Sequence, residues 1–274
     1  MTANSTHQLI SPSTVGLNLT DGRLGQIQTF EMHVSNWAYG VQVNAIHVDR
    51  NGTIFKLPDY GRRIEFIGDS LTAGMYDTYE TMAGWAWNLG EGLGQTEFSI
   101  TAYPGICLTD QNCWGNPRGQ SYLWYHIPDT SWRAQQMYGL NLENAPMYDF
   151  SSTPQADLVI INIGTNDNNT HNNVTNENYY NSYISLVEGV HSKYPKAQII
   201  IQSLWEGFSQ VGNTWAQGGG FVDEIKAVYE HFKPQGFIHY FNTTGILQHN
   251  DIVSSLCVPY LLAIGDGMGK DKWC

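Results

Sequence analysis

The sequence predicts an α/β fold, a three-layer α/β/α sandwich with a parallel sheet, preceded by a β-rich segment. Two nearly unbroken apolar runs, Leu158–Ile163 and Gln198–Leu204, have the composition of parallel strands that are buried on both faces. Helix-like segments alternate with such runs, which favours right-handed crossovers and helices on both sides of one sheet. The chain has 274 residues, 42% of them apolar, and is therefore long enough for one sizeable core.

The first part of the chain, residues 1–60, is expected to be β-rich. Residues 26–34 partly alternate between apolar and polar side chains, and residues 41–48 alternate better. A turn signal at Asp49-Arg-Asn-Gly52 precedes residues 53–57, which we predict as a third strand. Because so few strands can hardly form an independent sandwich, we treat this part as a segment that precedes the main domain.

The main domain is expected to span residues 61–251, where strands and helices alternate. Strands are predicted over 64–67, 98–102, 158–163, 198–204 and 237–241, and helices over 82–93, 177–193 and 221–232. Residues 104–131 are rich in Gly, Pro, Asn and aromatic side chains and are predicted to be a long loop. Residues 252–274 contain no convincing terminal helix and are treated as a divergent tail.

Charge and missing motifs exclude several classes of partner. The formal net charge is −12, and an acidic chain gains nothing from the release of counterions, so nucleic acid is not an expected partner. The longest late apolar stretch, residues 256–264, is too short to span a bilayer, so no membrane span is expected. The chain has no Cys-x-x-Cys pair, and we expect neither a metal nor a cofactor.

Glycosylation signals and cysteines favour a secreted protein. Asn-x-Ser/Thr sequons, which an Asn-rich chain also produces by chance, begin at Asn4, Asn18, Asn51, Asn168, Asn173 and Asn242. Cys107 and Cys113 lie in a loop-like stretch, where they form either a small disulfide or two free thiols. The N-terminus has no basic start and no apolar run, so it is not a signal peptide; either the chain is cytoplasmic or its true N-terminus is missing.

A serine at the end of a predicted strand is the strongest chemical signal. In Ile67-Gly-Asp-Ser-Leu-Thr-Ala-Gly74, small residues turn the chain at the carboxyl edge of the sheet, where open α/β sheets place their ligand sites. The turn would expose the Ser70 hydroxyl and aim a backbone N–H at a developing oxyanion. A serine acts as a nucleophile only when a base takes its proton. The alternative is an ordinary Gly/Ser turn.

Two further strand ends carry groups that suit an oxyanion site. Asn166 lies in Gly164-Thr-Asn-Asp167, directly after the strand 158–163, and its side-chain amide can donate to an oxyanion. The alternative is an Asx-type turn that caps the next helix. Gly105 follows the strand 98–102, and a glycine there lets its N–H approach a substrate closely.

With Ser70, Gly105 and Asn166 in this order, the sequence resembles the SGNH hydrolases, also called GDSL esterases. Gly68-Asp-Ser-Leu71 and Gly164-Thr-Asn-Asp167 match two blocks of that family literally. The resemblance implies a flavodoxin-like α/β/α fold and ester hydrolysis without a metal or cofactor. It also implies that Ser70 is the nucleophile and that Gly105 and Asn166 donate to the oxyanion.

Residues 63–70, Arg-Ile-Glu-Phe-Ile-Gly-Asp-Ser, resemble a junction in carbohydrate esterase family two, the acetyl-xylan-esterase-like branch. That branch carries a β-sandwich before its hydrolase domain, which implies that residues 1–60 are part of one. The implied substrate is an O-acetyl or other short acyl ester, on plant cell-wall polysaccharide or oligosaccharide or on a small molecule. The loop 104–131 and the segments after predicted elements hold aromatic residues whose faces suit sugars, although aromatic residues more often pack loops onto a core. These are Trp114, Tyr122, Trp124, Tyr125, Trp132, Trp205 and Trp215.

The catalytic histidine of the family is the one part that cannot be assigned. The family ends with an Asp-x-x-His block, and no Asp-x-x-His occurs in this chain. His249, with Asp251 nearby, is a weak candidate for the base, and His171 is another; each is otherwise a surface residue. Losing the base should lower the rate by several orders of magnitude. The alternatives are therefore a catalytically dead product of a truncated or wrongly spliced gene, or a sugar-binding protein that retains the cleft.

Overall fold

The fold was analysed in a computed structural model of the chain. The structure describes residues 5–8, 43–48, 50, 53–205 and 207–247. The chain divides into two units, residues 1–33 and 34–274, and every helix and strand named below belongs to the second unit.

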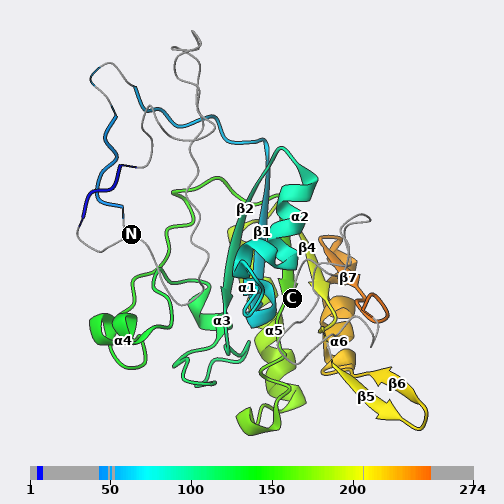
Figure 1. The fold of residues 1–274 in the computed structure, drawn as a ribbon. Coiled ribbons are helices and arrows are strands. Elements are labelled where there is room, and N and C mark those ends of the chain that lie inside the picture. The colour runs from blue at the N-terminus through cyan, green and yellow to red at the C-terminus, as the bar shows by residue number, and fades with distance from the viewer. Residues whose placement is uncertain (1–4, 9–42, 49, 51–52, 206, 248–274) are drawn as a thin grey trace. The chain divides into compact units, whose positions relative to one another are not determined.

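A five-stranded parallel sheet forms the centre of the second unit (Figure 1). Its strands are β1 (Arg62–Asp69), β2 (Thr96–Tyr103), β3 (Leu158–Asn162), β4 (Gln198–Gln202) and β7 (Ile238–Phe241), in the order β2-β1-β3-β4-β7. The predicted parallel sheet is therefore confirmed. The order reverses at β1, because β2 lies on one side of β1 and β3 on the other, and a ligand crevice forms at the carboxyl ends beside such a reversal.

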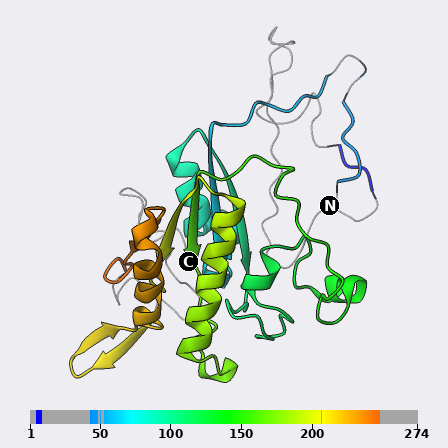
Figure 2. The ribbon, with the colours of Figure 1, turned by 180° about the vertical axis from the view of Figure 1, so that it is seen from behind.

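Helices connect these strands on both faces of the sheet. The α-helices are α1 (Ser70–Ala73), α2 (Trp85–Leu93), α3 (Gln120–Leu123), α4 (Trp132–Tyr138), α5 (Asn176–Lys193) and α6 (Val222–Phe232). Short 3₁₀ turns are η1 (Glu80–Ala83), η2 (Thr170–Asn172) and η3 (Lys233–Gln235), and an antiparallel hairpin joins β5 (Phe208–Val211) to β6 (Thr214–Gln217). Figure 1 shows α1 and α2 in front of the sheet, and Figure 2, from behind, shows α5 over the opposite face.

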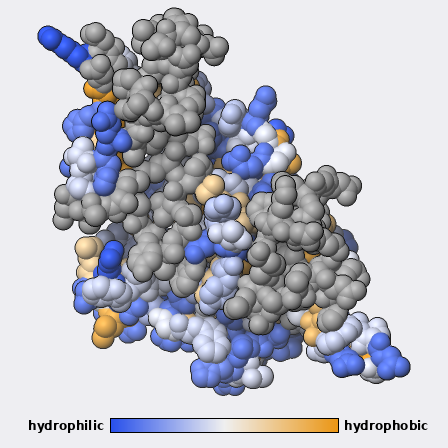
Figure 3. Space-filling view, viewed as in Figure 1, coloured by the Kyte–Doolittle hydropathy of each residue, from blue (hydrophilic) through white to orange (hydrophobic). Residues whose placement is uncertain are grey.

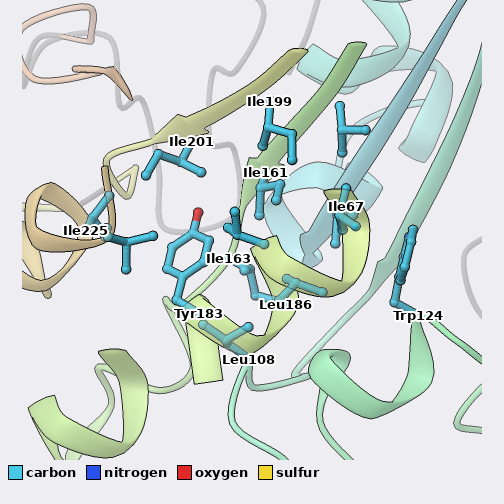
Figure 4. Close-up of a cluster of buried hydrophobic side chains, with 14 of the residues drawn as sticks. Ile67, Leu108, Trp124, Ile161, Ile163, Tyr183, Leu186, Ile199, Ile201 and Ile225 are labelled. Atoms are coloured by element: carbon cyan, nitrogen blue, oxygen red, sulfur yellow. The ribbon is translucent and has the colours of Figure 1, made fainter. Parts of the chain in front are cut away.

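Alternate residues of each central strand enter two separate cores. On β1, Phe66 packs in a cluster with Trp85 of α2, whereas its neighbour Ile67 packs with the residues of α5 and α6. On β3 the same alternation sends Ile160 to the first cluster and Ile161 to the second. Figure 4 shows the larger cluster, in which Ile67, Ile161 and Ile199 of three strands face Tyr183 and Leu186 of α5. Strands that are buried on both faces explain why the apolar runs in the sequence are unbroken.

A buried carboxyl group ties α5 and the α3 region to β1. Glu65 lies on the same side of β1 as Ile67 and accepts hydrogen bonds from the Trp124 indole N–H at 2.5 Å and the Tyr194 hydroxyl at 3.0 Å. Burial raises the pKa of Glu65, and these donors oppose that shift because they favour the charged form. All three residues are less than 8% exposed. If one of them is removed, water therefore cannot replace the hydrogen bond that its partner loses.

The structure corrects several predicted elements. Residues 43–48 and 53–57 are exposed and are not strands, although strands were predicted over 41–48 and 53–57. An extended segment becomes a strand only when a neighbour pairs with it, and no described residue pairs with these two segments. The predicted loop 104–131 contains the short helix α3, and the β5–β6 hairpin was not predicted. The predicted strand 26–34 and the tail 252–274 lie outside the described residues.

We predict that Glu65→Ala lowers the free energy of unfolding by about 2–4 kcal/mol, because it leaves the Trp124 N–H and the Tyr194 hydroxyl buried without an acceptor. Glu65→Gln retains an acceptor of the same size and should cost at most about 1 kcal/mol. Urea unfolding followed by tryptophan fluorescence measures both values. Equal losses in the two variants would contradict a hydrogen-bonding role for this carboxyl group.

Candidate active site

The turn after β1 places Ser70 at the start of α1. Asp69 caps this single helical turn, since its Oδ1 accepts the Leu71 N–H at 3.0 Å. Gly68 has no room for a side chain, because a Cβ there would lie 2.1 Å from Thr72 Oγ1 and 2.8 Å from the Asn162 carbonyl oxygen. Gly68 and Asp69 of the Gly-Asp-Ser motif therefore have structural roles, whereas the Ser70 side chain has none of this kind and is left half-buried at the carboxyl edge.

The turn after β2 carries Gly105 at a φ of +79°, a backbone conformation that favours glycine. A Cβ at this position would approach Trp114 Cβ to 3.0 Å. Cys107 and Cys113 form a disulfide with a Cα–Cα distance of 5.9 Å, so the disulfide alternative is confirmed and the free-thiol alternative is not. The disulfide closes the loop that starts two residues after Gly105.

The turn after β3 binds to the Gly105 loop through two side chains. Asn166 Nδ2 donates to the Ile106 carbonyl oxygen at 2.9 Å. Asp167 accepts the backbone N–H of Leu108 at 2.7 Å and that of Thr109 at 3.0 Å, one on each carboxylate oxygen. These bonds hold the Gly164–Asp167 turn against the loop that follows Gly105. The Asn166 amide has a second hydrogen, which is not involved in the bond to Ile106.

A second layer of contacts joins the same two loops further from the sheet. Asn172 is buried, and its Nδ2 donates to the Asn166 carbonyl oxygen at 2.8 Å. Gln111, inside the disulfide loop, donates from Nε2 to the Asn172 carbonyl oxygen at 2.7 Å. The ring of His171 stacks on Trp114 with a centroid distance of 4.8 Å. The sequence motif did not indicate Gln111 or Asn172, because both lie outside the motif and the bond between them spans 61 residues.

The two aspartates of the motifs are buried close to each other. Burial raises the pKa of Asp69 to about 7; the hydrogen bond from the Leu71 N–H opposes this rise, and the charge of Asp167 adds to it. Contacts with the hydroxyl and backbone N–H of Thr165 also favour the charged form of Asp69. Burial likewise raises the pKa of Asp167, against the N–H groups of Thr109 and Leu108. Among the described residues, Asp69 Oδ2 and Thr165 Oγ1 are both buried without a hydrogen-bond partner, so the first and third turns lie close together here but are not hydrogen-bonded through Asp69.

Three described histidines make contacts with neighbours other than Ser70. His126 is hydrogen-bonded to the Tyr122 carbonyl oxygen, and His239 to the Gln198 side chain. His191 stacks on Phe237. Among the described residues no histidine is hydrogen-bonded to Ser70. His249, the candidate base, lies outside the described residues.

The tryptophans divide into buried and exposed groups. Trp124 and Trp205 are less than 8% exposed and pack in the core, as the packing alternative proposed. Trp114 is 54% exposed beside Gly105, and Trp132 and Trp215 are 63% and 44% exposed. Trp114, Trp132 and Trp215 are thus the exposed members of these five, and His171 stacks on one face of the Trp114 ring.

Within the described part of the chain, no helix is long and apolar enough to cross a membrane. The same residues hold no group of three His, Cys, Asp or Glu side chains arranged to bind a metal ion.

We predict that Asp69→Asn flattens the pH dependence of stability between pH 5 and pH 8. The folded-state pKa of Asp69, about 7, lies above the ordinary value of 3.8. Its contribution to stability is therefore fully present below about pH 4 and is lost as the pH rises through 7. Asn keeps the helix cap but does not titrate, so the variant should gain about 1–4 kcal/mol relative to the wild type across this range. Unfolding in urea at each pH tests this, and parallel slopes for the two proteins would refute it.

Solved structures with a similar fold include three carbohydrate esterases. A family two carbohydrate esterase from Clostridium thermocellum, in complex with cellohexaose, has a TM-score of 0.50 and 22% identity over 69% of this chain and 56% of that chain. An acetyl xylan esterase from Butyrivibrio proteoclasticus has a TM-score of 0.50 and 19% identity, over 70% of this chain and 57% of that one. A carbohydrate esterase family 2 enzyme plus carbohydrate-binding domain from Corynascus thermopiles (Myceliophthora fergusii) has a TM-score of 0.52 and 19% identity, over 69% and 58%. The chain spans less than two thirds of the length of these structures.

No curated protein sequence matches the chain. The sequence profile of the GDSL-like lipase/acylhydrolase family matches residues 66–255, which include the turns that carry Ser70, Gly105 and Asn166. This match spans more than half of the chain and begins inside β1, where the first motif begins. Together with the parallel sheet and the three turns at one of its edges, it shows that the chain belongs to the GDSL-like lipase/acylhydrolase family.

Proposed function

We propose that this protein carries the site of a serine esterase for short acyl esters, above all O-acetyl groups, of carbohydrates, and that its turnover of them is very slow because the Asp-x-x-His block is missing. The observation that carries the proposal is the meeting of three turns at one sheet edge, where Asn166 and Asp167 of the third turn are hydrogen-bonded to the loop that follows Gly105. The family match supports ester hydrolysis. The fold shared with carbohydrate esterases, one of them in complex with cellohexaose, supports a carbohydrate as the carrier of the ester.

In the proposed mechanism, Ser70 Oγ attacks the acyl carbon. The backbone N–H groups of Ser70 and Gly105 and the free hydrogen of the Asn166 amide would stabilise the oxyanion of the tetrahedral intermediate. A base would take the Ser70 proton and give it to the leaving sugar hydroxyl, and water would then hydrolyse the acyl-enzyme. The part of the chain that the structure describes offers no histidine bonded to Ser70 for this step, so His249 remains the candidate.

Three features support an acylated sugar in an extracellular setting. Trp114 presents an exposed ring beside Gly105, and an aromatic face suits the C–H surface of a sugar ring. The Cys107–Cys113 disulfide fits an oxidising compartment. The Asn168, Asn173 and Asn242 sequons are exposed, as N-glycosylation requires.

A second candidate function is carbohydrate binding without hydrolysis. It is favoured by the missing Asp-x-x-His block, because the oxyanion groups and the exposed Trp114 do not depend on that block. A product of a truncated gene would behave in the same way.

We predict slow hydrolysis of an activated aryl acetate and almost none of acetylated xylan. Oxyanion donors alone support a residual rate of roughly 10³–10⁴ over water, whereas a sugar alcohol needs a proton before it leaves. Release of the aryl alcohol, followed by absorbance beside a Ser70→Ala control, measures the first rate, and acetate release from xylan the second. If Ser70→Ala hydrolyses the aryl ester as fast as the wild type, the nucleophile assignment fails.

The candidate base is tested by His249→Ala. We expect the residual aryl acetate rate to stay within about twofold of the wild type, because the Asp-x-x-His block that would position a base for Ser70 is missing from the sequence around His249. A fall of about 10²-fold or more, with a bell-shaped pH profile in the wild type that the variant lacks, would instead identify His249 as the base.

A further inference from the structure

The backbone turn that contains Gly105 has a defined type. The Ile106 N–H donates to the Tyr103 carbonyl oxygen at 3.3 Å, which closes a turn over residues 103–106. The ring of Pro104 holds its φ at about −65° at the second position of the turn. Gly105 has a φ of +79° at the third position. A type I turn needs a negative φ there, so this is a type II turn.

The two turn types differ in the direction of their central peptide, which here joins Pro104 to Gly105. Exchanging type II for type I rotates this peptide by about 180°. A trans peptide is planar, and its C=O and N–H point in opposite directions. The direction of the Pro104 carbonyl oxygen therefore fixes the direction of the Gly105 N–H. Glycine adopts either sign of φ readily, so this direction depends on what the carbonyl oxygen binds.

Asn116 binds the Pro104 carbonyl oxygen from the loop that packs against the turn. Its Nδ2 donates to this oxygen at 3.0 Å and to the Cys113 carbonyl oxygen at 3.0 Å, one hydrogen of the amide for each. Both partners are acceptors, so only the nitrogen of the side-chain amide fits here. Asn116 is 6% exposed, and its Nδ2 would lie 3.1 Å from a Cβ on Gly105. The contact is therefore buried directly against the turn.

The disulfide loop holds Asn116 in place. Asn116 and Cys113 exchange two backbone hydrogen bonds, of 2.9 and 3.0 Å. Cys113 is joined covalently to Cys107, whose carbonyl oxygen accepts the Gln120 N–H at 2.8 Å. The amide that binds Pro104 thus belongs to a closed and hydrogen-bonded part of the chain, which restricts its movement away from the turn.

The opposite end of the same peptide, the Gly105 N–H, lies in the turn beside that of Ser70. Asp69 and Tyr103 are level in neighbouring strands, so the turns that follow them leave the sheet side by side. The carboxyl ends of the strands lie towards the bottom of Figure 1, and Figure 3 shows the described surface there as mostly hydrophilic. Gly105 is half-buried, and among the described residues its N–H donates to no acceptor. Within this part of the chain the N–H is available to a ligand oxygen.

We propose that Asn116 is a positioning residue, which holds the Pro104 carbonyl oxygen and thereby keeps the Gly105 N–H directed at the oxyanion formed at Ser70. The inference rests on the proposed function for the reaction that this N–H serves. The bond from Asn116 also polarises the peptide, which makes its N–H a stronger donor. Without Asn116 the type I form becomes accessible, and in that form the N–H points away from the oxyanion.

The first test reads the direction of the peptide by NMR and does not need catalysis. The Pro104 Hα lies close to the Gly105 amide hydrogen in a type II turn and further from it in a type I turn. We expect a strong nuclear Overhauser effect between these hydrogens in the wild type and a clearly weaker one in Asn116→Ala. Asn116→Ser, whose hydroxyl ends one bond short of the position of Nδ2, should resemble Asn116→Ala and replaces it if that variant does not fold.

Asn88→Ala is the matched control for both tests. Asn88 Nδ2 also donates to two backbone carbonyl oxygens, those of Met82 at 3.4 Å and Gly84 at 2.8 Å, but in another turn. This variant should therefore lose comparable hydrogen bonds and keep the wild-type Overhauser effect. An effect of wild-type strength in a folded Asn116 variant would overturn the proposal.

The second test measures aryl acetate hydrolysis with Ser70 intact. Asn116→Ala should lower kcat by about ten- to a hundredfold and leave KM within about twofold, because one oxyanion donor contributes roughly 10²–10³ to kcat and acts in the transition state. Asn88→Ala should keep both constants within about twofold of the wild type. An unchanged kcat in Asn116→Ala, or an equal fall in Asn88→Ala, would show that Asn116 has no positioning role. Wild-type hydrolysis that does not depend on Ser70 would contradict the esterase function, whereas the NMR result would still decide whether Asn116 directs the peptide.

Discussion

The parallel pairing of β1 with β2 and β3 is the constraint on which the candidate site depends. In this register Gly68 lies level with Ala102 on one side and with Asn162 on the other. The three chains therefore leave the sheet at the same height, and their turns meet because the strand order reverses at β1. Side-chain bonds between the turns then need to span only short distances, which is why Asn166 reaches Ile106 directly.

Two buried carboxylates serve as acceptors for the backbone of these turns. Asp69 caps the helix that starts at Ser70, and Asp167 accepts two consecutive N–H groups of the disulfide loop. Burying two acidic groups near each other costs free energy, and the raised pKa of Asp69 reflects that cost. The cost is offset because the N–H groups that they satisfy would otherwise be buried without partners.

The turns that would hold a nucleophile and an oxyanion do not depend for their structure on the residues that would supply the base. The turns are stabilised by one another and by the sheet, whereas the base belongs to a block near the C-terminus that this sequence does not contain. Family membership therefore predicts the structure of the turns at the carboxyl edge of the sheet better than it predicts the rate of ester hydrolysis. An exposed aromatic such as Trp114 would serve binding as well as catalysis.

The sequence by itself determined the sheet, because strands buried on both faces need unbroken apolar runs such as Leu158–Ile163, and it determined the motif turns, because small and polar residues mark the strand ends. Tertiary structure decided what depends on neighbours remote in sequence. Residues 53–57 were predicted as a strand after a turn signal, but they have no described partner to pair with. The spacing of Cys107 and Cys113 was compatible with a disulfide or with two free thiols, and the fold places them close enough to form the disulfide. Composition did not separate the buried Trp124 from the exposed Trp215, because burial depends on which surface packs against each ring.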